Sequence, residues 1–502
     1  MLTTKPIDLR PDHAEIIHQI LKDNLEEGTY VFAFGSRANW TAKQSSDLDL
    51  AIDSFGEKMD RKVKANLEDA FEECDLPYTV DVVDYNSISD SFREVIKDDM
   101  VRVLWDWSLT LLEDLISDEI CRGITPKYTD KENLFAWVIN QKCIRDNKVN
   151  IKLARKNDLS IRKVSTVKLL QDYDVLVNST GVGTLGRVAQ FKLKDAHPCT
   201  VDSHVTIIRP NQDIIDPIYL GYLIKAKQSE IEYLGEGSTG QTELSRENLK
   251  SLSILHTKNR SEQKRIAEIL SSLDDKIEIN KQINQTLEEM AQTLFRQWFD
   301  NYESKAYKFY SLDELVSQLK PGTNYQPKRV EKGIPFLNVR NLSNGFIDDS
   351  DFKFITEEEY KRVHKSWQPE EHDILISRIG TLGLVATIRK EDLPIAVHYN
   401  MINLKAKRTS FQFLYYLLKS EYFQIEYDTV KRASVQEYVA IDDAKNIQIP
   451  LFKDNNEFLN FEKQFIPLFD KTEKNFNQIK TLENMRDTLL PKLMSGEVRV
   501  KL

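Results

Sequence analysis

The sequence predicts an α+β protein of several domains, with a small α/β domain at the N-terminus and two β-rich domains after it. Each β-rich domain is followed by a long helix, and we expect the two helices to pair as an antiparallel coiled coil. Three observations lead to this prediction. The 502 residues are too many for one hydrophobic core. The larger, C-terminal part of the chain repeats itself, and the excess of acidic residues is confined to the first 108 residues.

Composition limits the class of protein. Hydrophobic residues make up 41% of the chain and charged residues 29%, which is typical of a globular protein and not of a disordered one. No apolar run approaches the roughly 20 residues that span a bilayer, and the first residues lack the apolar segment of an export signal. We therefore expect a cytoplasmic protein without a membrane partner. The four cysteines lie far apart and predict neither a zinc site nor a disulfide framework.

The net charge of −10 is unevenly distributed. Residues 1–108 contain 12 basic and 23 acidic residues, whereas the remainder contains 57 basic and 56 acidic ones. The acidity thus belongs to one N-terminal domain. The rest of the chain is nearly neutral and can still present basic faces to phosphate, so composition neither supports nor excludes DNA binding.

An internal repeat with a period of about 195 residues is the most informative feature. The segment DVLVNSTGVGTLGRVAQF (Asp174 to Phe191) returns as DILISRIGTLGLVATI (Asp373 to Ile388). Further matches upstream and downstream keep offsets between 194 and 199. Because the unit is as large as a domain, the short-period solenoid families are excluded. Each copy begins with about 145 residues of short β-rich runs broken by Gly, Asn and Pro.

Each copy ends in a long helix whose apolar residues follow steps of three and four. This spacing predicts a coiled-coil seam, although a helix lying on a domain core would show a similar pattern. In the first copy the seam residues are Ile266, Leu270, Leu273, Ile277, Asn280, Asn284, Leu287, Ala291, Leu294 and Trp298. In the second copy they are Phe465, Leu468, Thr472, Asn475, Ile479, Leu482, Leu489 and Leu493, with Arg486 interrupting the pattern. Two such helices in repeat register favour pairing with each other.

Asn280 and its counterpart Asn475 occupy equivalent seam positions. A buried asparagine in a seam lowers stability but fixes the register of the helices. The competing interpretation is that both side chains face solvent.

Residues 109–502 resemble the specificity subunit of type I restriction–modification enzymes. The order of domains and helices carries the resemblance, together with the paired GTLG segments and three further motifs. These are WVINQKCIRDNKV (Trp137 to Val149), PFLNVRNLSNGFI (Pro335 to Ile347) and LENMRDTLLPKLMSGEV (Leu482 to Val498). The resemblance implies target-recognition domains over residues 109–257 and 304–452, a central coiled-coil helix over 258–303 and a C-terminal one over 453–502.

The same resemblance implies a function in phage defence and DNA methylation. Members of the family read a split site in double-stranded DNA, one half with each recognition domain, and are not enzymes by themselves. Two methyltransferase subunits dock on the helices and use S-adenosylmethionine, and restriction subunits join and use ATP, so those cofactors belong to the partners. Half-sites about one duplex turn apart, roughly 35 Å, need a rigid spacer, which paired helices of about 50 Å can provide.

Side chains that can contact DNA are candidates only. Arg and Lys read guanine edges and bind phosphate, and Asn and Gln pair with adenine. The candidates are Lys142, Lys156, Arg187 and Gln241 in the first recognition domain, and Arg340, Arg378, Lys431, Arg432 and Gln436 in the second. A solvated surface position is the competing interpretation for each. We expect the glycines of GTLG to permit a tight turn and not to contact phosphate.

The N-terminal 108 residues do not belong to that architecture. Tyr30 to Asp53 predicts strand, polar loop, strand, with a helix before it over His13 to Glu27. A helix over Glu57 to Cys74 and a strand over Thr79 to Tyr85 follow. With Gly35-Ser36 after the first strand and DLDL opening the second, this domain resembles the minimal nucleotidyltransferases of the polymerase-β-like superfamily.

The residues suit that chemistry. Gly35 and Ser36 let backbone N–H groups approach a triphosphate. Asp47 and Asp49 lie two apart on one strand and point to the same face, and Asp81 lies on a neighbouring strand. Their carboxylates could bind Mg²⁺, making these three residues the candidate catalytic and metal-binding set, with Gly35 and Ser36 binding the nucleoside triphosphate.

Alternatives remain at this point. Asn39 and Trp40 stand where relatives often have Arg and Gly, so the N-terminal domain is either a catalyst or a binding-only module. For the whole chain the alternatives to a DNA-recognition subunit are a nucleotidyltransferase targeted by the repeat domains and a purely structural coiled-coil adaptor.

Overall fold

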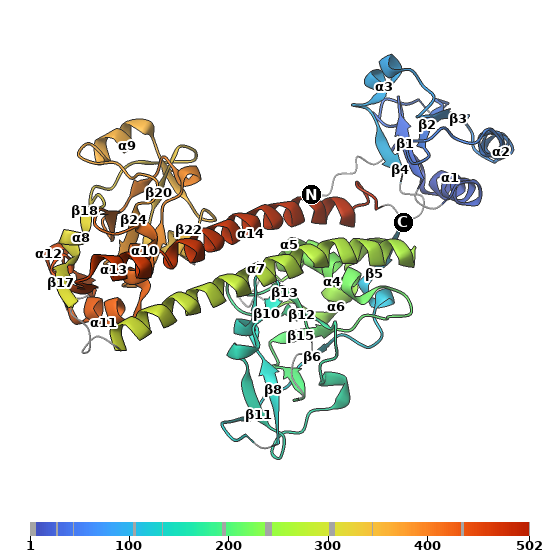
Figure 1. Cartoon of the computed structure of the whole chain (residues 1–502). Helices are drawn as coiled ribbons and strands as arrows, with labels where there is room; N and C mark the ends of the chain where they lie inside the picture. The colour runs from blue at the N-terminus through green and yellow to red at the C-terminus, as the bar shows by residue number, and fades with distance from the viewer. Residues whose placement is uncertain are drawn as a thin grey trace. The chain divides into compact units, whose positions relative to one another are not determined.

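The computed structural model describes residues 7–26, 29–43, 45–103, 107–132, 134–192, 197–235, 243–300, 307–343, 345–432 and 436–500. Figure 1 shows the helices and strands of the chain. Their contacts divide the chain into two compact units. Unit 1 contains residues 1–275 and 482–502, and unit 2 contains residues 276–481. None of the described helices is both long enough and apolar enough to cross a membrane.

The N-terminal domain in unit 1 is a four-stranded sheet of order β3-β2-β1-β4. β1 and β2 are antiparallel, and β2 and β3 are parallel because α2 connects them as a crossover. α2 begins at Arg61, later than the sequence pattern predicted, because the Asp60 side chain accepts hydrogen bonds from the next backbone N–H groups and caps the helix. The elements are α1 (Pro11–Asn24), β1 (Tyr30–Phe34), β2 (Leu48–Asp53), α2 (Arg61–Glu72), β3 (Val80–Asp84), α3 (Asp90–Ile96) and β4 (Val101–Val103).

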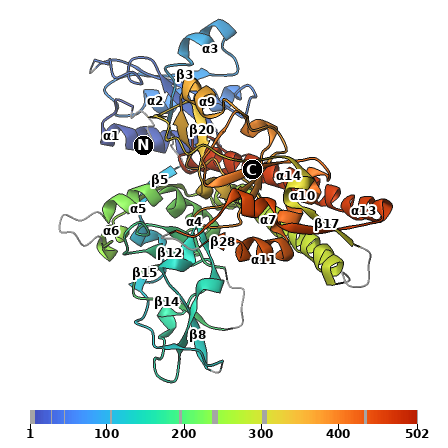
Figure 2. The same cartoon turned by 90° about the vertical axis from the view of Figure 1, so that its left-hand side faces the viewer.

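The first repeat, also in unit 1, contains two four-stranded sheets and three short helices among its described residues. Several of its strands and its helices are labelled in Figure 2. One sheet has the order β13-β12-β15-β6, from β6 (Cys121–Arg122), β12 (Val175–Asn178), β13 (Val188–Gln190) and β15 (Val205–Ile208). The other has the order β14-β8-β11-β7, from β7 (Tyr128–Thr129), β8 (Phe135–Ile139), β11 (Arg155–Asp158) and β14 (Cys199–Val201). The helices are α4 (Pro217–Ala226), α5 (Gln228–Leu234) and α6 (Arg246–Lys250).

Two strand pairs complete this repeat. β9 (Ile144–Arg145) and β10 (Lys148–Val149) form a hairpin, and β5 (Trp107–Leu111) pairs with β16 (Ser253–Thr257). β5 therefore spans residue 108, where the sequence pattern placed the end of the N-terminal domain, and its pairing assigns it to the first repeat. A hydrophobic cluster joins the first sheet to α4, with Val175, Val177 and Ile208 packing against Tyr219 and Leu220.

The second repeat, in unit 2, has the same topology. Its sheets are β18-β27-β24-β25 and β19-β23-β20-β26, and each repeat contains one parallel pair at the equivalent place, β8 with β14 and β20 with β26. The strands are β17 (Tyr307–Ser311), β18 (Val316–Pro321), β19 (Arg329–Val330), β20 (Ile334–Leu337), β21 (Leu342–Ser343), β22 (Phe346–Ile347), β23 (Lys353–Ile355), β24 (Ile374–Ser377), β25 (Val385–Thr387), β26 (Ala396–Val397), β27 (Met401–Ala406), β28 (Lys431–Arg432), β29 (Tyr438–Val439) and β30 (Gln448–Phe452).

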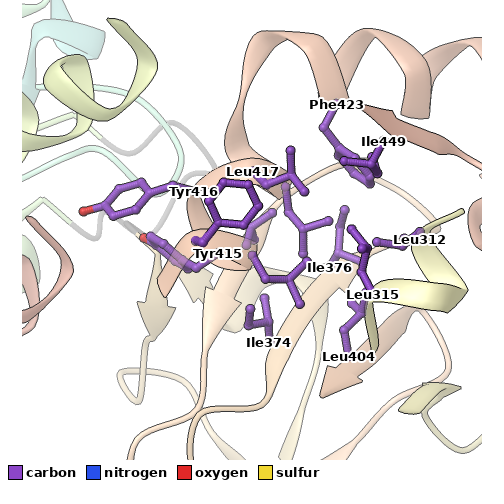
Figure 3. Close-up of a cluster of buried hydrophobic side chains, with 14 of the residues drawn as sticks. Leu312, Leu315, Ile374, Ile376, Leu404, Tyr415, Tyr416, Leu417, Phe423 and Ile449 are labelled. Carbon is purple, nitrogen blue, oxygen red and sulfur yellow. The ribbon is translucent and has the colours of Figure 1, made fainter. Parts of the chain in front are cut away.

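The core of the second repeat lies between α10 and the sheet that contains β24 and β27 (Figure 3). Ile374 and Ile376 on β24 and Leu404 on β27 are fully or almost fully buried there, beside Tyr415 and Leu417 of α10. The helices are α8 (Leu312–Leu315), α9 (Glu357–Val363), α10 (Phe411–Lys419), α11 (Glu421–Thr429), α12 (Ile441–Lys445) and α13 (Asn455–Glu462).

Two long helices, α7 (Arg260–Asp300) and α14 (Phe465–Met494), pair antiparallel. In unit 1, Ile266 and Leu270 pack in one cluster with Leu490 and Leu493. In unit 2, Phe295 packs against Phe465 at a centroid distance of 4.7 Å. α7 has 41 residues, or about 60 Å of helix, and α13 precedes α14 as a separate short helix where the sequence pattern predicted one continuous helix.

Polar side chains lie inside this helix pair. Asn280 and Asn475 are 1% and 0% exposed, so both face the partner helix and not solvent. Asn280 Nδ2 donates to Gln478 Oε1 (3.1 Å), and Asn475 Nδ2 donates to Asn284 Oδ1 (2.8 Å). Arg486 also lies inside the pair and donates to Asp274 of α7 (2.9 Å). These specific partners suit the register role.

Candidate functional site

The three candidate catalytic carboxylates lie at neighbouring positions of the N-terminal sheet. Asp49 on β2 is directly opposite Asp81 on β3 in the parallel register. Asp47 precedes β2 and is exposed, as is Asp81, whereas Asp49 is half-buried. The Asp47 Oδ1 atom accepts a hydrogen bond from the Thr79 hydroxyl. The sheet thus brings these residues to one end of β2 and β3.

The carboxylates repel one another electrostatically. Burial raises the pKa of Asp49 above its ordinary value, and the negative charges of Asp81 and Asp47 raise it further. A bound cation would relieve this repulsion, and oxygen donors are those that Mg²⁺ prefers. Among the described residues, however, no group of three or more acidic, His or Cys side chains is already gathered closely enough to hold a metal ion. The donor chemistry fits Mg²⁺, but a closed set of three protein ligands is not formed.

The Gly35-Ser36 turn lies beside the same carboxylate. Gly35 follows β1 with φ +75°, and a Cβ atom there would lie 2.7 Å from Asp49 Oδ2. Only glycine fits so close to this carboxylate in the left-handed conformation. The turn continues with the Thr41 backbone N–H donating to the Ser36 carbonyl (2.9 Å). The backbone of this turn and the Asp49 side chain therefore face one small region.

Arg37 holds this turn in place, a role that the sequence pattern did not indicate. Its guanidinium is buried and donates to the carbonyls of Ser46 (2.9 Å) and Asp8 (3.1 Å). It also lies 3.7 Å from the centre of the Tyr78 ring. Trp40, in the same turn, has φ +57° and is 57% exposed. The local sequence does not indicate this role, because Asp8, Ser46 and Tyr78 lie in separate segments of the chain.

In the first repeat the DNA candidates are in different surroundings. Lys142 is exposed, and Arg187 is half-buried and donates to the Gly183 carbonyl (2.8 Å). Lys156 on β11 forms an ion pair with Glu132 and lies 4.8 Å from the centre of the Phe135 ring. Gln241 lies outside the described residues.

In the second repeat most candidates converge on one turn. β28 and β29 form a hairpin that contains Lys431, Arg432 and Gln436, and Tyr438 of this hairpin forms a bridge with Ile379. Arg378 Nε donates to the Val439 carbonyl (2.9 Å), which fastens the same hairpin. A Cβ atom on Gly380 would lie 3.7 Å from Gln436 Nε2.

Several of these cations already have acidic partners. Lys431 pairs with Asp428 (2.9 Å), and Arg432 donates to both carboxylate oxygens of Asp443 (2.6 and 2.9 Å). Arg340 lies apart from this hairpin in sequence and pairs with Asp351 (2.8 Å). These surface pairs are weak, so DNA phosphates can compete for the cations.

The GTLG segments form tight turns, as expected. The first and last glycine of each segment has a positive φ, between 72° and 87°. In both repeats a helix lies against the last glycine. A Cβ atom on Gly186 would lie 2.9 Å from the Cα atom of Glu232 in α5, and one on Gly383 would meet the Gln424 side chain of α11. Both repeats therefore present the same turn, supported from behind by the equivalent helix.

Comparisons with known proteins agree with this architecture. The family model "Type I restriction modification DNA specificity domain" matches residues 112–289 and 304–481, and the model "Polymerase beta, Nucleotidyltransferase" matches residues 15–104. The chain therefore belongs to the type I restriction–modification specificity family, and it carries a nucleotidyltransferase-like domain at its N-terminus.

Individual relatives fall into the same two groups. The type I restriction enzyme MjaIX specificity subunit of Methanocaldococcus jannaschii is 28% identical over 434 residues, covering 80% of this chain and 96% of its own length. The probable protein adenylyltransferase MntA of Haemophilus influenzae is 40% identical over 97 residues, covering 19% of this chain and 83% of its own length. The crystal structure of the type I S subunit from M. genitalium is 20% identical, with a TM-score of 0.48, and covers 79% of this chain and 96% of that one.

Proposed function

We propose that this chain is the DNA-recognition subunit of a type I restriction–modification complex, in which each repeat reads one half of a split DNA site. The observation that carries the proposal is the duplication of a whole domain together with its helix. Two copies of one topology, each joined to one of two paired helices, suit a DNA site that is itself divided.

The proposed DNA contacts centre on the GTLG turn of each repeat. Arg187 and Lys142 belong to this region in the first repeat, and Arg378, Gln436 and the β28–β29 hairpin belong to it in the second. Side chains fastened to a rigid turn lose little entropy on binding. The residue set thus combines guanine- and adenine-reading side chains with cations for phosphate.

The proposed partners are two methyltransferase subunits and restriction subunits, docked on the paired helices. Co-expression of the chain with the methyltransferase of its own operon, followed by size-exclusion chromatography with light scattering, tests this. We expect one copy of the chain with two methyltransferase subunits. Absence of any complex would contradict the proposal.

For the N-terminal domain we propose nucleotide binding with Mg²⁺ and transfer of a nucleotidyl group. The likeness to a probable protein adenylyltransferase and the facing carboxylates Asp49 and Asp81 support it. Asp47, Asp49 and Asp81 would hold Mg²⁺, which supplies charge neutralisation at the phosphates when bound. Gly35 and Ser36 would orient the triphosphate through their backbone.

Labelled nucleoside triphosphates, Mg²⁺ and the partner subunits test this second proposal. We expect wild-type protein to transfer label, and Asp47→Ala with Asp49→Ala to abolish transfer while leaving DNA methylation intact. If wild type neither transfers label nor binds nucleotide by calorimetry, the domain is a docking module. Loss of DNA methylation in the double variant would contradict the independence of the two functions.

A further inference from the structure

The most exposed large apolar side chain among the described residues lies in the first repeat. Val182 is 99% exposed, the highest value for a large hydrophobic side chain in the described part of the chain. It lies at the tip of the turn between β12 and β13, between Gly181 (φ +103°) and Gly183 (φ +72°). Single exposed apolar residues are ordinary, so exposure alone implies nothing.

The backbone that carries Val182 is firmly held. The N–H groups of Thr184 and Leu185 both donate to the Gly181 carbonyl (3.1 and 2.9 Å), and Gly186 N–H donates to the Asn178 carbonyl (2.8 Å). Arg187 closes the turn by donating to the Gly183 carbonyl. A tip that is fixed in this way presents its side chain without a large entropic cost on binding.

The turn that carries Val182 is also held by Gln141, from the segment that follows β8. Gln141 donates through Nε2 to both the carbonyl and the hydroxyl of Thr180, and Thr180 Oγ1 also lies 2.8 Å from His204 Nδ1. A Cβ atom on Gly181 would lie 2.9 Å from the Gln141 amide nitrogen, so this side chain packs directly beneath the tip. The residue after Gln141 is the exposed Lys142.

The second repeat lacks this tip. β12 and β13 are separated by residues 179–187, whereas the equivalent β24 and β25 are separated by residues 378–384, which is two residues fewer. Thr180 bridges Glu243 as Ile379 bridges Tyr438, so Gly181 and Val182 are the additional pair. The insertion therefore distinguishes the two recognition turns. One supporting hydrogen bond is common to both, because Gly186 N–H donates to the Asn178 carbonyl (2.8 Å) as Gly383 N–H donates to the Ser377 carbonyl (3.0 Å).

We propose that Val182 contacts the 5-methyl group of a thymine in the half-site read by the first repeat, an inference that rests on the proposed DNA-recognition function. An apolar side chain beside cations is the means by which proteins detect this methyl in the major groove. Valine is shorter than Phe, Leu, Ile and Met, which are used in the alternative role of a wedge between base pairs. Arg187, whose guanidinium donates to the carbonyl of the adjacent Gly183, supplies the neighbouring positive charge.

The test uses the full chain in complex with its methyltransferase partner. Duplexes carry the site that the complex methylates, and each thymine in turn is replaced by uracil, which lacks only the methyl. We expect one replacement to weaken binding by wild type about fourfold, the factor for one buried methyl group. Val182→Ala is expected to bind thymine and uracil duplexes equally, whereas Val95→Ala, the same change at an exposed valine of the N-terminal domain, is expected to retain the wild-type preference.

The outcomes separate this inference from the function on which it rests. If wild type binds its site but no uracil replacement weakens it, or if Val182→Ala keeps the full preference for thymine, the inference is wrong and the recognition function stands. If the wild-type complex has no sequence preference, the recognition function itself fails. Val182→Ile retains an apolar tip and is expected to keep the preference.

Discussion

At the scale of single residues, a buried ion pair joins the C-terminal segment to the start of α7 within unit 1. Arg499, near the C-terminus, donates twice to the carboxylate of Glu262 at the start of α7 (2.7 and 2.6 Å). The two side chains are 3% and 1% exposed. The Arg499 backbone N–H also donates to the Tyr30 hydroxyl on β1 (3.3 Å), so the C-terminal segment contacts both α7 and the N-terminal domain.

Replacing Arg499 by alanine is expected to destabilise unit 1. The change leaves the Glu262 carboxylate buried without its counter-charge, which costs about 3–5 kcal/mol in comparable cases. Hydrogen exchange in the first turns of α7 measures the effect. Arg265→Ala is the control, because Arg265 and Glu268 form a half-exposed pair worth at most about 1 kcal/mol. Equal exchange rates in the two variants would show that the buried pair does not stabilise the start of α7.

The facing carboxylates predict a dependence of stability on pH. The raised pKa of Asp49 means that the folded protein binds this proton more tightly than the unfolded chain. Stability is therefore lost as pH rises from the unfolded pKa, about 3.9, through the raised folded pKa, and the loss is complete above it. Asp81→Asn removes one of the repelling charges and is expected to raise the melting temperature at pH 7 in the absence of Mg²⁺.

This gain should fade as the pH falls below about 4, where Asp49 is protonated in both states. Thermal unfolding across this pH range, with Asp98→Asn at an exposed site as the control, measures it. A lower melting temperature for Asp81→Asn at pH 7 would mean that Asp81 stabilises the sheet in a way that the charges do not explain.

The placement of residues on strands was predicted more completely than the partners of their side chains. The resemblance to the minimal nucleotidyltransferases placed Asp49 and Asp81 on neighbouring strands, and the parallel pairing of β2 with β3 puts them opposite each other. It could not show that Arg432 faces Asp443 or that Arg378 holds the Val439 carbonyl, because these contacts depend on how a hairpin folds back. The role of Arg37 was not predicted for the same reason. The exposure of Val182 was not predicted because it belongs to no repeating pattern of apolar residues.

At the scale of elements, the long helices were predicted well and their ends less well. A three-four spacing of apolar residues specifies which face is buried, and none of the predicted seam residues is exposed. Arg486, which interrupts the pattern, is accommodated by Asp274, a partner on the other helix that periodicity cannot reveal. The break between α13 and α14 was missed, although Pro467, in the first turn of α14, is compatible with a helix that starts there.

The buried asparagines are expected to lower the stability of the helix pair while they fix the register of the two helices. Asn475 Oδ1 is buried and finds no hydrogen-bond partner among the described residues, which typically costs about 1–3 kcal/mol. Asn475→Leu is therefore expected to raise the melting temperature of the helix pair, measured by circular dichroism. Gln285→Leu, on the exposed side of α7, is the control and should change it little. A lower melting temperature for Asn475→Leu would show that its bond to Asn284 outweighs the burial cost.

At the scale of the whole molecule, the sequence repeat determined most of what could be predicted. A nearly constant offset, held through many segments, predicted two domains of the same topology, and the strand orders of the two repeats agree. The division of charge separated the N-terminal domain, whose net of −11 makes it a poor surface for DNA phosphates. The base sequence that is read could not be predicted, because it depends on side chains at turns that vary within one fold.

The most direct test of the recognition account is genome-wide mapping of methylated adenines in cells that express this chain with its methyltransferase. The comparison is between wild type and a variant with seven residues added to both long helices, inserted into α7 between Asp275 and Asn280 and into α14 between Gln478 and Arg486. Seven residues preserve the seam and add about 10 Å, at most roughly three base-pair steps. We predict a split motif for wild type, and the same half-sites with a longer gap for the variant. An undivided wild-type motif, or an unchanged gap in the variant, would contradict the account.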